Sequence, residues 1–258
     1  MAKRSARRMQ KQAAHAYGQD AYEGDNVRKL FDEPSWSPVP SHQQTEHARD
    51  QKYRKNIKPQ NESQQALLDA IDSSPLVFAA GAAGTGKTYL AVAKGVEALE
   101  SGRVKRIVLS RPAVEAGESL GFLPGDMEEK LSPYLRPLYD ALCDRLSIKR
   151  LKALTAEGVI EIAPIAYMRG RTLNNAYVVI DEAQNCTYSQ LKMLLTRLGW
   201  NSSMVVTGDP AQTDLLPGMS GFDDVVTKLE AVEKVSVVRF SREDVVRHPL
   251  VAEMIDVL

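Results

Sequence analysis

The chain has 258 residues, of which 43% are hydrophobic and 26% charged, as is ordinary for a soluble globular protein. It contains no run of about 18 apolar residues, so we expect no membrane-spanning helix, and the basic N-terminus lacks the apolar segment of a secretory signal. The only cysteines, Cys143 and Cys186, are too few for a disulfide framework or a cysteine metal site, and they predict reduced thiols in a cytoplasmic protein.

The net charge of zero conceals an uneven distribution along the chain. Residues 1–58 carry twelve Lys and Arg against seven Asp and Glu, a net charge of +5, and the remaining residues carry −5. Residues 1–55 are also poor in aliphatic side chains and rich in Gln, Ser, Pro, Arg and Lys, which is typical of segments that do not fold alone. We therefore expect a flexible basic N-terminal arm over 1–58, with a polyanion as its candidate partner.

Beyond this arm, helical and strand patterns alternate. Residues 61–71 are expected to form a helix. Six short apolar runs predict strands: Leu76–Ala80, Arg106–Ser110, Val159–Ala163, Tyr177–Asp181, Met204–Gly208 and Val235–Phe240. Further helices are expected at Thr88–Glu100, Ser189–Leu198 and Gly221–Leu229. Strands alternating with helices favour right-handed βαβ units, so we predict one α/β domain over 59–258 with a mainly parallel sheet.

The first strand leads directly into a glycine-rich segment, GAAGTGKT, which matches G-x-x-x-x-G-K-[ST] with a strand before it and a helix after it. Such glycines let backbone N–H groups surround a phosphate, and the helix start adds partial positive charge. Lys87 can reach the β- and γ-phosphates of a nucleotide, and the Thr88 hydroxyl can ligate Mg²⁺. The alternative, a glycine-rich turn with a solvated lysine, is disfavoured by the flanking elements. The predicted nucleotide-binding residues here are Gly81, Ala82, Ala83, Gly84, Thr85, Gly86, Lys87, Thr88 and Tyr89.

Two acids, Asp181 and Glu182, end a later apolar strand. Parallel sheets bind ligands at the carboxyl ends of their strands. We expect Asp181 to hold Mg²⁺ through a water, opposite Thr88, and Glu182 to orient or deprotonate the water that attacks the γ-phosphate. An isolated acid pair would instead be a solvated turn. Because an activated water serves a hydrolase and not a small-molecule kinase, the pair favours an ATPase.

Gln212 follows another predicted strand, in the segment Asp209-Pro-Ala-Gln212. A polar side chain just beyond a neighbouring strand can touch the γ-phosphate and report its loss, so Gln212 is the candidate sensor. The spacing alone is equally compatible with an ordinary loop glutamine.

Several segments together resemble the PhoH-like family, the phosphate-starvation-inducible ATPases of bacteria and phages. The segments are Gly81–Thr88, RPAVEAGESLGFLPGDMEEKLSPYLRPLYDAL at 111–142, IAPIAYMRGRTLNN at 162–175, VVIDEAQN at 178–185, VVTGDPAQTDL at 205–215 and DVVRHPLV at 244–251. The resemblance covers essentially 59–258 and excludes the N-terminal arm. Segment 111–142 is the diagnostic one, because phosphate-loop motifs occur in many unrelated ATPases.

The core of this family is similar to the first RecA-like domain of superfamily 1 helicases, and that similarity implies further roles. Gln64 would contact adenine, and Arg111 would face nucleic acid or the nucleotide. Gln212 would match the glutamine of the G-D-x-x-Q element that senses the γ-phosphate. The expected fold is therefore a single RecA-like P-loop NTPase domain.

One RecA-like core leaves the γ-phosphate open on a side that superfamily 1 helicases close with a second domain. The family is thought to form rings, so the resemblance implies a homo-oligomer, expected to be a hexameric ring, in which a neighbouring subunit completes the site. Arg247 is the first candidate for an arginine finger, followed by Arg169 and Arg171. A surface salt bridge is the alternative for each.

The leading expectation is a ring-forming ATPase that uses ATP and Mg²⁺ and acts on single-stranded RNA by translocation or unwinding. The ATPase part rests on the residues above, and the RNA part rests on the resemblance and the +5 arm. Two rivals stay open. One is a remodelling or signalling ATPase whose partner is a protein. The other is a small-molecule kinase, for which residues 126–139 form the only insertion large enough for a lid or acceptor pocket.

Overall fold

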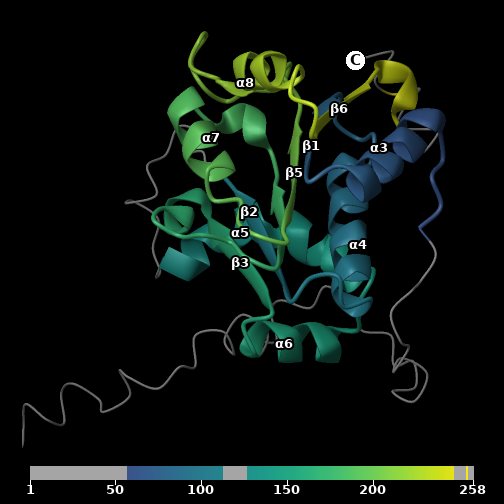
Figure 1. Cartoon of the computed structure of the whole chain (residues 1–258), viewed down its shortest axis with the longest axis vertical. Helices are drawn as coiled ribbons and strands as arrows, with labels where there is room; N and C mark the ends of the chain where they lie inside the picture. The colour runs from purple at the N-terminus through teal and green to yellow at the C-terminus, as the bar shows by residue number, and fades with distance from the viewer. Residues whose placement is uncertain (1–56, 113–126, 247–253, 255–258) are drawn as a thin grey trace, which may run out of the picture. The chain divides into compact units, whose positions relative to one another are not determined.

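The computed structural model describes residues 57–112, 127–246 and 254, and within 127–133 it describes the backbone alone. Six strands form one sheet in the order β3-β2-β4-β5-β1-β6, and all five pairings are parallel. The strands are β1 (Leu76–Gly81), β2 (Arg106–Arg111), β3 (Ile160–Pro164), β4 (Ala176–Ile180), β5 (Ser203–Gly208) and β6 (Val235–Phe240). All six predicted strands and the mainly parallel sheet are confirmed (Figure 1).

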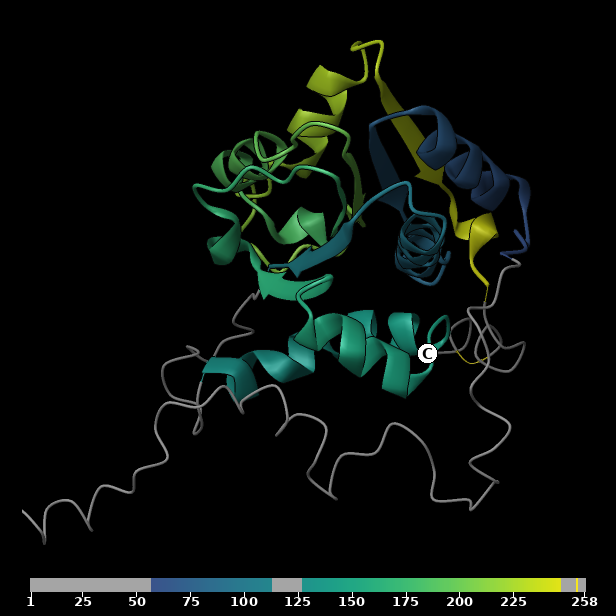
Figure 2. The same ribbon diagram turned by 60° about the horizontal axis from the view of Figure 1, so that its bottom comes forward.

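Helices cover both faces of this sheet (Figure 1). One face carries α3 (Glu62–Ser73), α4 (Lys87–Glu100), α5 (Met127–Cys143) and α6 (Ile148–Ala156). The other carries α7 (Tyr188–Leu195), α8 (Phe222–Leu229) and the 3₁₀ turns η3 (Ile165–Met168) and η4 (Ala183–Asn185), and a third turn, η5 (Arg242–Asp244), follows β6. Figure 2 brings α5 and α6 forward, with α5 packed beside α4 and α6 beside α5. Neither α5 nor α6 was predicted as a helix from the sequence.

The core divides into two clusters, one on each face of the sheet. In β1, Val77 and Ala79 pack toward α3 and α4, whereas Leu76, Phe78 and Ala80 pack toward the opposite layer. Side chains of a strand alternate between faces, and both faces of this sheet are covered. The strands therefore consist of continuous apolar runs, as buried parallel sheets require.

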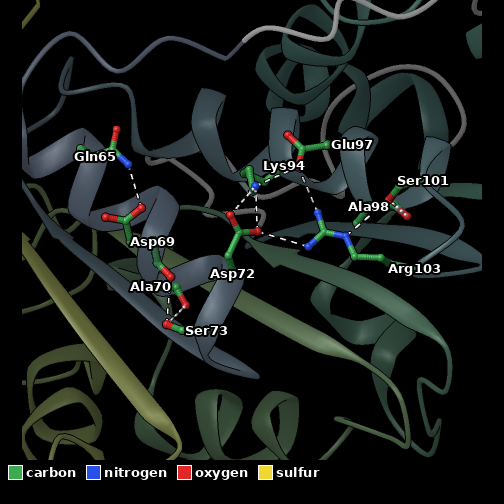
Figure 3. A network of polar contacts seen from close by, with 10 residues as sticks. All are labelled: Gln65, Asp69, Ala70, Asp72, Ser73, Lys94, Glu97, Ala98, Ser101 and Arg103. Atoms are coloured by element: carbon green, nitrogen blue, oxygen red, sulfur yellow. Dashed lines mark hydrogen bonds and ion pairs between the residues drawn. The ribbon is translucent and has the colours of Figure 1, made fainter.

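An ion network joins α3, α4 and the turn before β2 (Figure 3). Lys94 of α4 lies 2.7 Å from the carboxylate of Asp72 and 2.9 Å from that of Glu97. Arg103 lies 3.2 Å from each of the same two carboxylates. The network fixes α4 against α3, and α4 begins at the glycine-rich segment.

The arm predicted over 1–58 lies outside the described residues except for its last two positions, so the arm and the domain boundary at residue 59 stay predictions. None of the helices in the described ranges is long and apolar enough to span a bilayer.

Candidate functional site

A cavity of about 570 Å³ opens at the carboxyl edge of the sheet. It is lined by the glycine-rich segment and the start of α4, by Arg111 at the end of β2, and by the second half of α5. The remaining wall comes from Asp181 and Glu182 after β4 and from residues 207–209 at the end of β5. Because β5 pairs with β1 on one side and with β4 on the other, the loops after these three strands meet here. The volume is in the range of sites for nucleotide-sized ligands.

The backbone of the glycine-rich segment has the conformation that an anion site needs. Gly84 and Gly86 have φ values of +80° and +84°, the left-handed region that favours glycine. A Cβ at Gly86 would also lie 3.0 Å from the amide nitrogen of Gln64. Gly86 is the N-cap of α4, and no side chain caps the first N–H groups of this helix. Those N–H groups and the positive end of the helix dipole are therefore available to phosphate oxygens.

Lys87, in the first turn of α4, is 8% exposed. Its Nζ donates hydrogen bonds to the carbonyls of Gly81 and Ala82, each at 2.7 Å. Among the described residues, no carboxylate lies within 4.0 Å of this ammonium group. Burial lowers the pKa of Lys87, and the negative charges of Asp209 and other nearby acids only partly oppose this shift. The cation is thus buried in the loop without a directly paired anion.

Asp181 is the centre of a buried oxygen cluster. One of its oxygens accepts hydrogen bonds from the hydroxyls of Thr88 and Thr207, each at 2.6 Å, and the other lies 3.5 Å from Arg111. Because the Thr88 hydroxyl donates its hydrogen bond to Asp181, the lone pairs of the hydroxyl oxygen remain available to a cation. A hydroxyl beside a carboxylate is a hard-oxygen donor set that suits Mg²⁺.

A Mg²⁺ ion held by Thr88 and Asp181 would need a nucleotide to complete its coordination. The described parts of the chain contain no group of three or more His, Cys, Asp or Glu side chains that could hold a metal ion. Mg²⁺ is usually held by one or two protein oxygens, with substrate phosphates and waters as the other ligands. Thr88 and Asp181 therefore fit the metal role predicted for them.

Glu182 has an unusual backbone conformation, with φ +53° and ψ +42°. A non-glycine residue in this left-handed region costs about 1–2 kcal/mol, so the surrounding loop must hold it there. Its carboxylate accepts a hydrogen bond from the Gln184 amide and lies 3.5 Å from Arg111. The result is an acid at the cavity wall with its side chain about one-third exposed.

Two predicted glutamines contact the site from outside the cavity. The side chain of Gln64 is buried, donates to the carbonyl of Thr85 at 3.0 Å and accepts from the N–H of Gln60 at 2.8 Å. It braces the glycine-rich segment, and its contact with adenine stays a prediction. Gln212 is exposed and does not line the cavity, although its backbone carbonyl accepts from Gln184 at 3.2 Å. Its sensor role likewise stays a prediction.

The three finger candidates have different surroundings. Arg171 pairs with Glu161 through two bonds of 2.5 and 2.6 Å, and this pairing raises the pKa of Arg171. Arg169 is exposed, and its guanidinium makes no ion pair or hydrogen bond to the residues that the structure describes. Arg247 lies outside the described residues. All three remain candidates, and Arg169 has the freer guanidinium of the two that can be compared.

Three buried polar residues of this region were not found from the sequence. Thr207 supplies a second hydroxyl to Asp181, and a threonine within the apolar run of β5 was the available signal. Asp209 accepts a hydrogen bond from the N–H of Ala83 at 2.9 Å, and Gln184 contacts Glu182. Both follow a strand end, where any polar residue qualifies, so spacing could not single them out.

Comparisons with known proteins agree with the resemblance seen in the sequence. The chain is 55% identical over 203 residues to a PhoH-like protein of Bacillus subtilis (strain 168), covering 78% of this chain and 64% of that protein. It is 50% identical over 206 residues to Protein PhoH of Escherichia coli (strain K12), covering 79% and 58%. The chain thus spans about 60% of the length of these curated relatives.

Solved structures with similar folds include the large terminase of a thermophilic bacteriophage, at a TM-score of 0.48 and 11% identity over 77% of this chain and 50% of that one. The Pif1 helicase of Candida albicans follows at a TM-score of 0.38 and 16% identity, with 72% of this chain and 40% of that one covered. The family model described as PhoH-like protein matches residues 56–258. The chain therefore belongs to the PhoH-like protein family.

Proposed function

We propose that this chain hydrolyses ATP with Mg²⁺ in the cavity at the carboxyl edge of the sheet. One observation carries the proposal: Lys87, the Thr88–Asp181 pair and Glu182 all line the same cavity. Each part alone has a structural explanation. Together they supply a phosphate cation, a metal-binding oxygen pair and a water-activating acid.

The polyphosphate would lie along the loop 81–88, where the N–H groups at the start of α4 bind its oxygens. Lys87 would exchange its two carbonyl partners for phosphate oxygens, which pair its charge and offset the cost of its burial. Mg²⁺ bound at Thr88 and Asp181 would neutralise charge that develops between the β- and γ-phosphates. Binding therefore uses the features that leave Lys87 without an anion of its own.

Glu182 would act on the attacking water. Its carboxylate accepts a proton from the water while the water oxygen bonds to the γ-phosphorus, the bond to the β–γ bridging oxygen breaks, and ADP and inorganic phosphate leave. Arg111 lies 3.5 Å from both Asp181 and Glu182, where its positive charge offsets the repulsion between the two carboxylates.

The decisive experiment compares Lys87→Ala and Glu182→Gln with Glu157→Gln, an exposed control acid at the end of α6. Lys87→Ala should lose both nucleotide affinity and turnover. Glu182→Gln should bind ATP normally and lose about 10²-fold or more in turnover, the scale of a missing general base. Wild-type hydrolysis by Glu182→Gln would refute the catalytic assignment.

The kinase alternative differs in its products. Pro137 of the insertion 126–139 lines the cavity, and Asp140 and Asp144, which follow the insertion, line it as well, so the insertion reaches the site. A hydrolase releases inorganic phosphate in water without any added acceptor, whereas a kinase releases little until an acceptor is supplied. Phosphate release by the purified chain alone therefore separates the two.

We further propose that the ATPase works as a homo-oligomer coupled to single-stranded RNA. The support is the +5 charge of residues 1–58 and a candidate nucleotide cavity that is open to solvent in the described domain. Native mass should show the assembly, and single-stranded RNA should raise the ATPase rate. Deleting residues 1–55 should weaken RNA binding and flatten its salt dependence while leaving the basal rate intact. Stimulation by a protein and not by RNA would favour the remodelling alternative.

A further inference from the structure

Gln184 is 1% exposed, and all of its polar side-chain atoms are engaged. Its Nε2 donates to a carboxylate oxygen of Glu182 and to the backbone carbonyl of Gln212, the latter at 3.2 Å. Its Oε1 accepts the backbone N–H of Asp209 at 3.0 Å. One buried amide thus joins the acid after β4 to the loop after β5.

The contacts continue beyond Asp209 to the phosphate-binding segment. The Asp209 carboxylate accepts the N–H of Ala83 at 2.9 Å, and Asp209 is itself 6% exposed. A chain of hydrogen-bonded residues therefore runs from Glu182 through Gln184 and Asp209 to Ala83. Buried hydrogen bonds of this kind restrict the groups that they join.

The amide of Gln184 has little freedom to leave this position. A Cβ built on Gly208 would lie 3.1 Å from Gln184 Oε1 and 2.9 Å from the ring of Phe222. The space beside the amide is therefore closed by the end of β5 and by α8. By contrast, the other partner of Glu182, Arg111, lies at 3.5 Å and is partly exposed.

We propose that Gln184 is a positioning residue, which holds the Glu182 carboxylate toward the attacking water and ties it to the phosphate-binding segment through Asp209. The inference rests on the proposed hydrolysis at Glu182. A general base acts only within hydrogen-bond reach of the proton that it takes, and a displacement of about 1 Å can cost about 10²-fold in rate. Nε2 binds one carboxylate oxygen, and the other, which lies 3.5 Å from Arg111, keeps a lone pair that can accept the proton of the water.

The test is the substitution Gln184→Met, which keeps the length of the side chain and removes its hydrogen bonds. We expect kcat to fall by about 10- to 10²-fold, while the Kd of a non-hydrolysable ATP analogue changes by less than about twofold, since Gln184 does not line the cavity. Asn185→Ala is the matched control. It loses its hydrogen bonds to Asp214 in the same loop but none to Glu182, and it should keep kcat.

A second variant keeps the test decisive if Gln184→Met fails to fold. Gln184→Glu has nearly the same volume and keeps the acceptor for Asp209, but it replaces the donor to Glu182 with a second carboxylate. It should lower kcat at least as strongly, with a thermal midpoint that shows a folded protein.

A double-mutant cycle separates positioning from a merely structural role. If Gln184 acts through Glu182, then Gln184→Met should change the residual single-turnover rate by less than about twofold in a Glu182→Gln background. An equal loss in both backgrounds, or wild-type kcat in both Gln184 variants, would overturn the inference. Wild-type turnover by Glu182→Gln alone would instead overturn the proposed function on which it rests.

Discussion

The two buried lysines of α4 lie seven residues apart and have opposite surroundings. Lys94 is 6% exposed and is paired with the carboxylates of Asp72 and Glu97 (Figure 3). Lys87 is 8% exposed and bonds only to uncharged oxygens of its own loop. The fold thus places two carboxylates at contact distance from the Lys94 ammonium group. Among the described residues, it places none at that distance from the Lys87 ammonium group.

This difference distinguishes a structural cation, Lys94, from Lys87, the cation that the proposed function assigns to phosphate binding. A buried charge is costly unless it is paired. Lys94 offsets that cost within the chain, so its pairing holds two helices together. Lys87 does not, and the uncapped start of α4 adds further positive potential beside it. A bound polyphosphate would supply the missing anion.

The largest expected effect is on turnover. Lys87→Met should lower kcat by about 10²- to 10³-fold, the range for removing one preorganised stabilising donor, whereas Lys94→Met should leave kcat within about twofold. Steady-state phosphate release measures both. A comparable loss in the two variants would remove the distinction between the lysines.

The next effect is on the free energy of unfolding, which Lys94→Met should lower more than Lys87→Met does. Lys94→Met should lower the free energy of unfolding by about 1–3 kcal/mol, below the range of about 3–5 kcal/mol for fully buried pairs, because Asp72 and Glu97 are partly exposed. Lys87→Met should lower it by less, or raise it, because a buried and unpaired charge disappears. Urea unfolding of both variants without nucleotide measures the difference.

A smaller effect is expected at the outer edge of the Lys94 network. Arg103 pairs with the same two carboxylates, but its side chain is 47% exposed. Arg103→Gln should therefore lower the free energy of unfolding by at most about 1 kcal/mol, the usual value of exposed ion pairs, and the loss should shrink at high salt. A loss as large as that of Lys94→Met would mean that Arg103 shares the central role.

The smallest effect is a pH dependence at alkaline pH. Because burial lowers the pKa of Lys87 in the folded chain below its ordinary value of 10.5, the unfolded chain holds this proton more tightly. The resulting cost to stability is full below the folded pKa and is relieved as the pH rises from that value toward 10.5. The stability of Lys87→Met relative to wild type should therefore fall over this range. A difference in the free energy of unfolding between Lys87→Met and wild type that stays constant with pH would mean that burial of the Lys87 charge does not destabilise the fold.

The sequence was sufficient for the sheet, and several residues that it singled out, among them Lys87, Thr88 and Asp181, line one cavity. Short apolar runs such as Tyr177–Ile180, alternating with helical patterns, favour strands in a sheet covered on both faces, and the glycine-rich motif predicts which strand and helix it joins. Helix α5 was missed because Pro133 and Pro137 argue against a helix. It forms nonetheless, with Leu138 and Leu142 fully buried against the core.

Side-chain direction was the part that could not be predicted. The resemblance places Gln64 near the site, and the spacing after β5 places Gln212 there. The structure turns Gln64 onto the loop backbone and leaves Gln212 exposed. Gln184 reaches Glu182 because the left-handed backbone of Glu182 is followed by the 3₁₀ turn η4. This backbone conformation depends on hydrogen bonds between segments that are distant in the sequence, and motif spacing does not predict such bonds.

The central claim is that the buried Lys87 ammonium group pairs with the phosphates of a bound nucleotide. Its most direct test is how much a nucleotide raises the free energy of unfolding. A non-hydrolysable ATP analogue with Mg²⁺, at about 100 times its Kd for wild type, should stabilise the wild type and Lys94→Met by about 2.7 kcal/mol each. Lys87→Met should show little or no stabilisation at the same concentration. If Lys87→Met gains as much stability as the wild type, Lys87 does not bind the phosphates and the account is wrong.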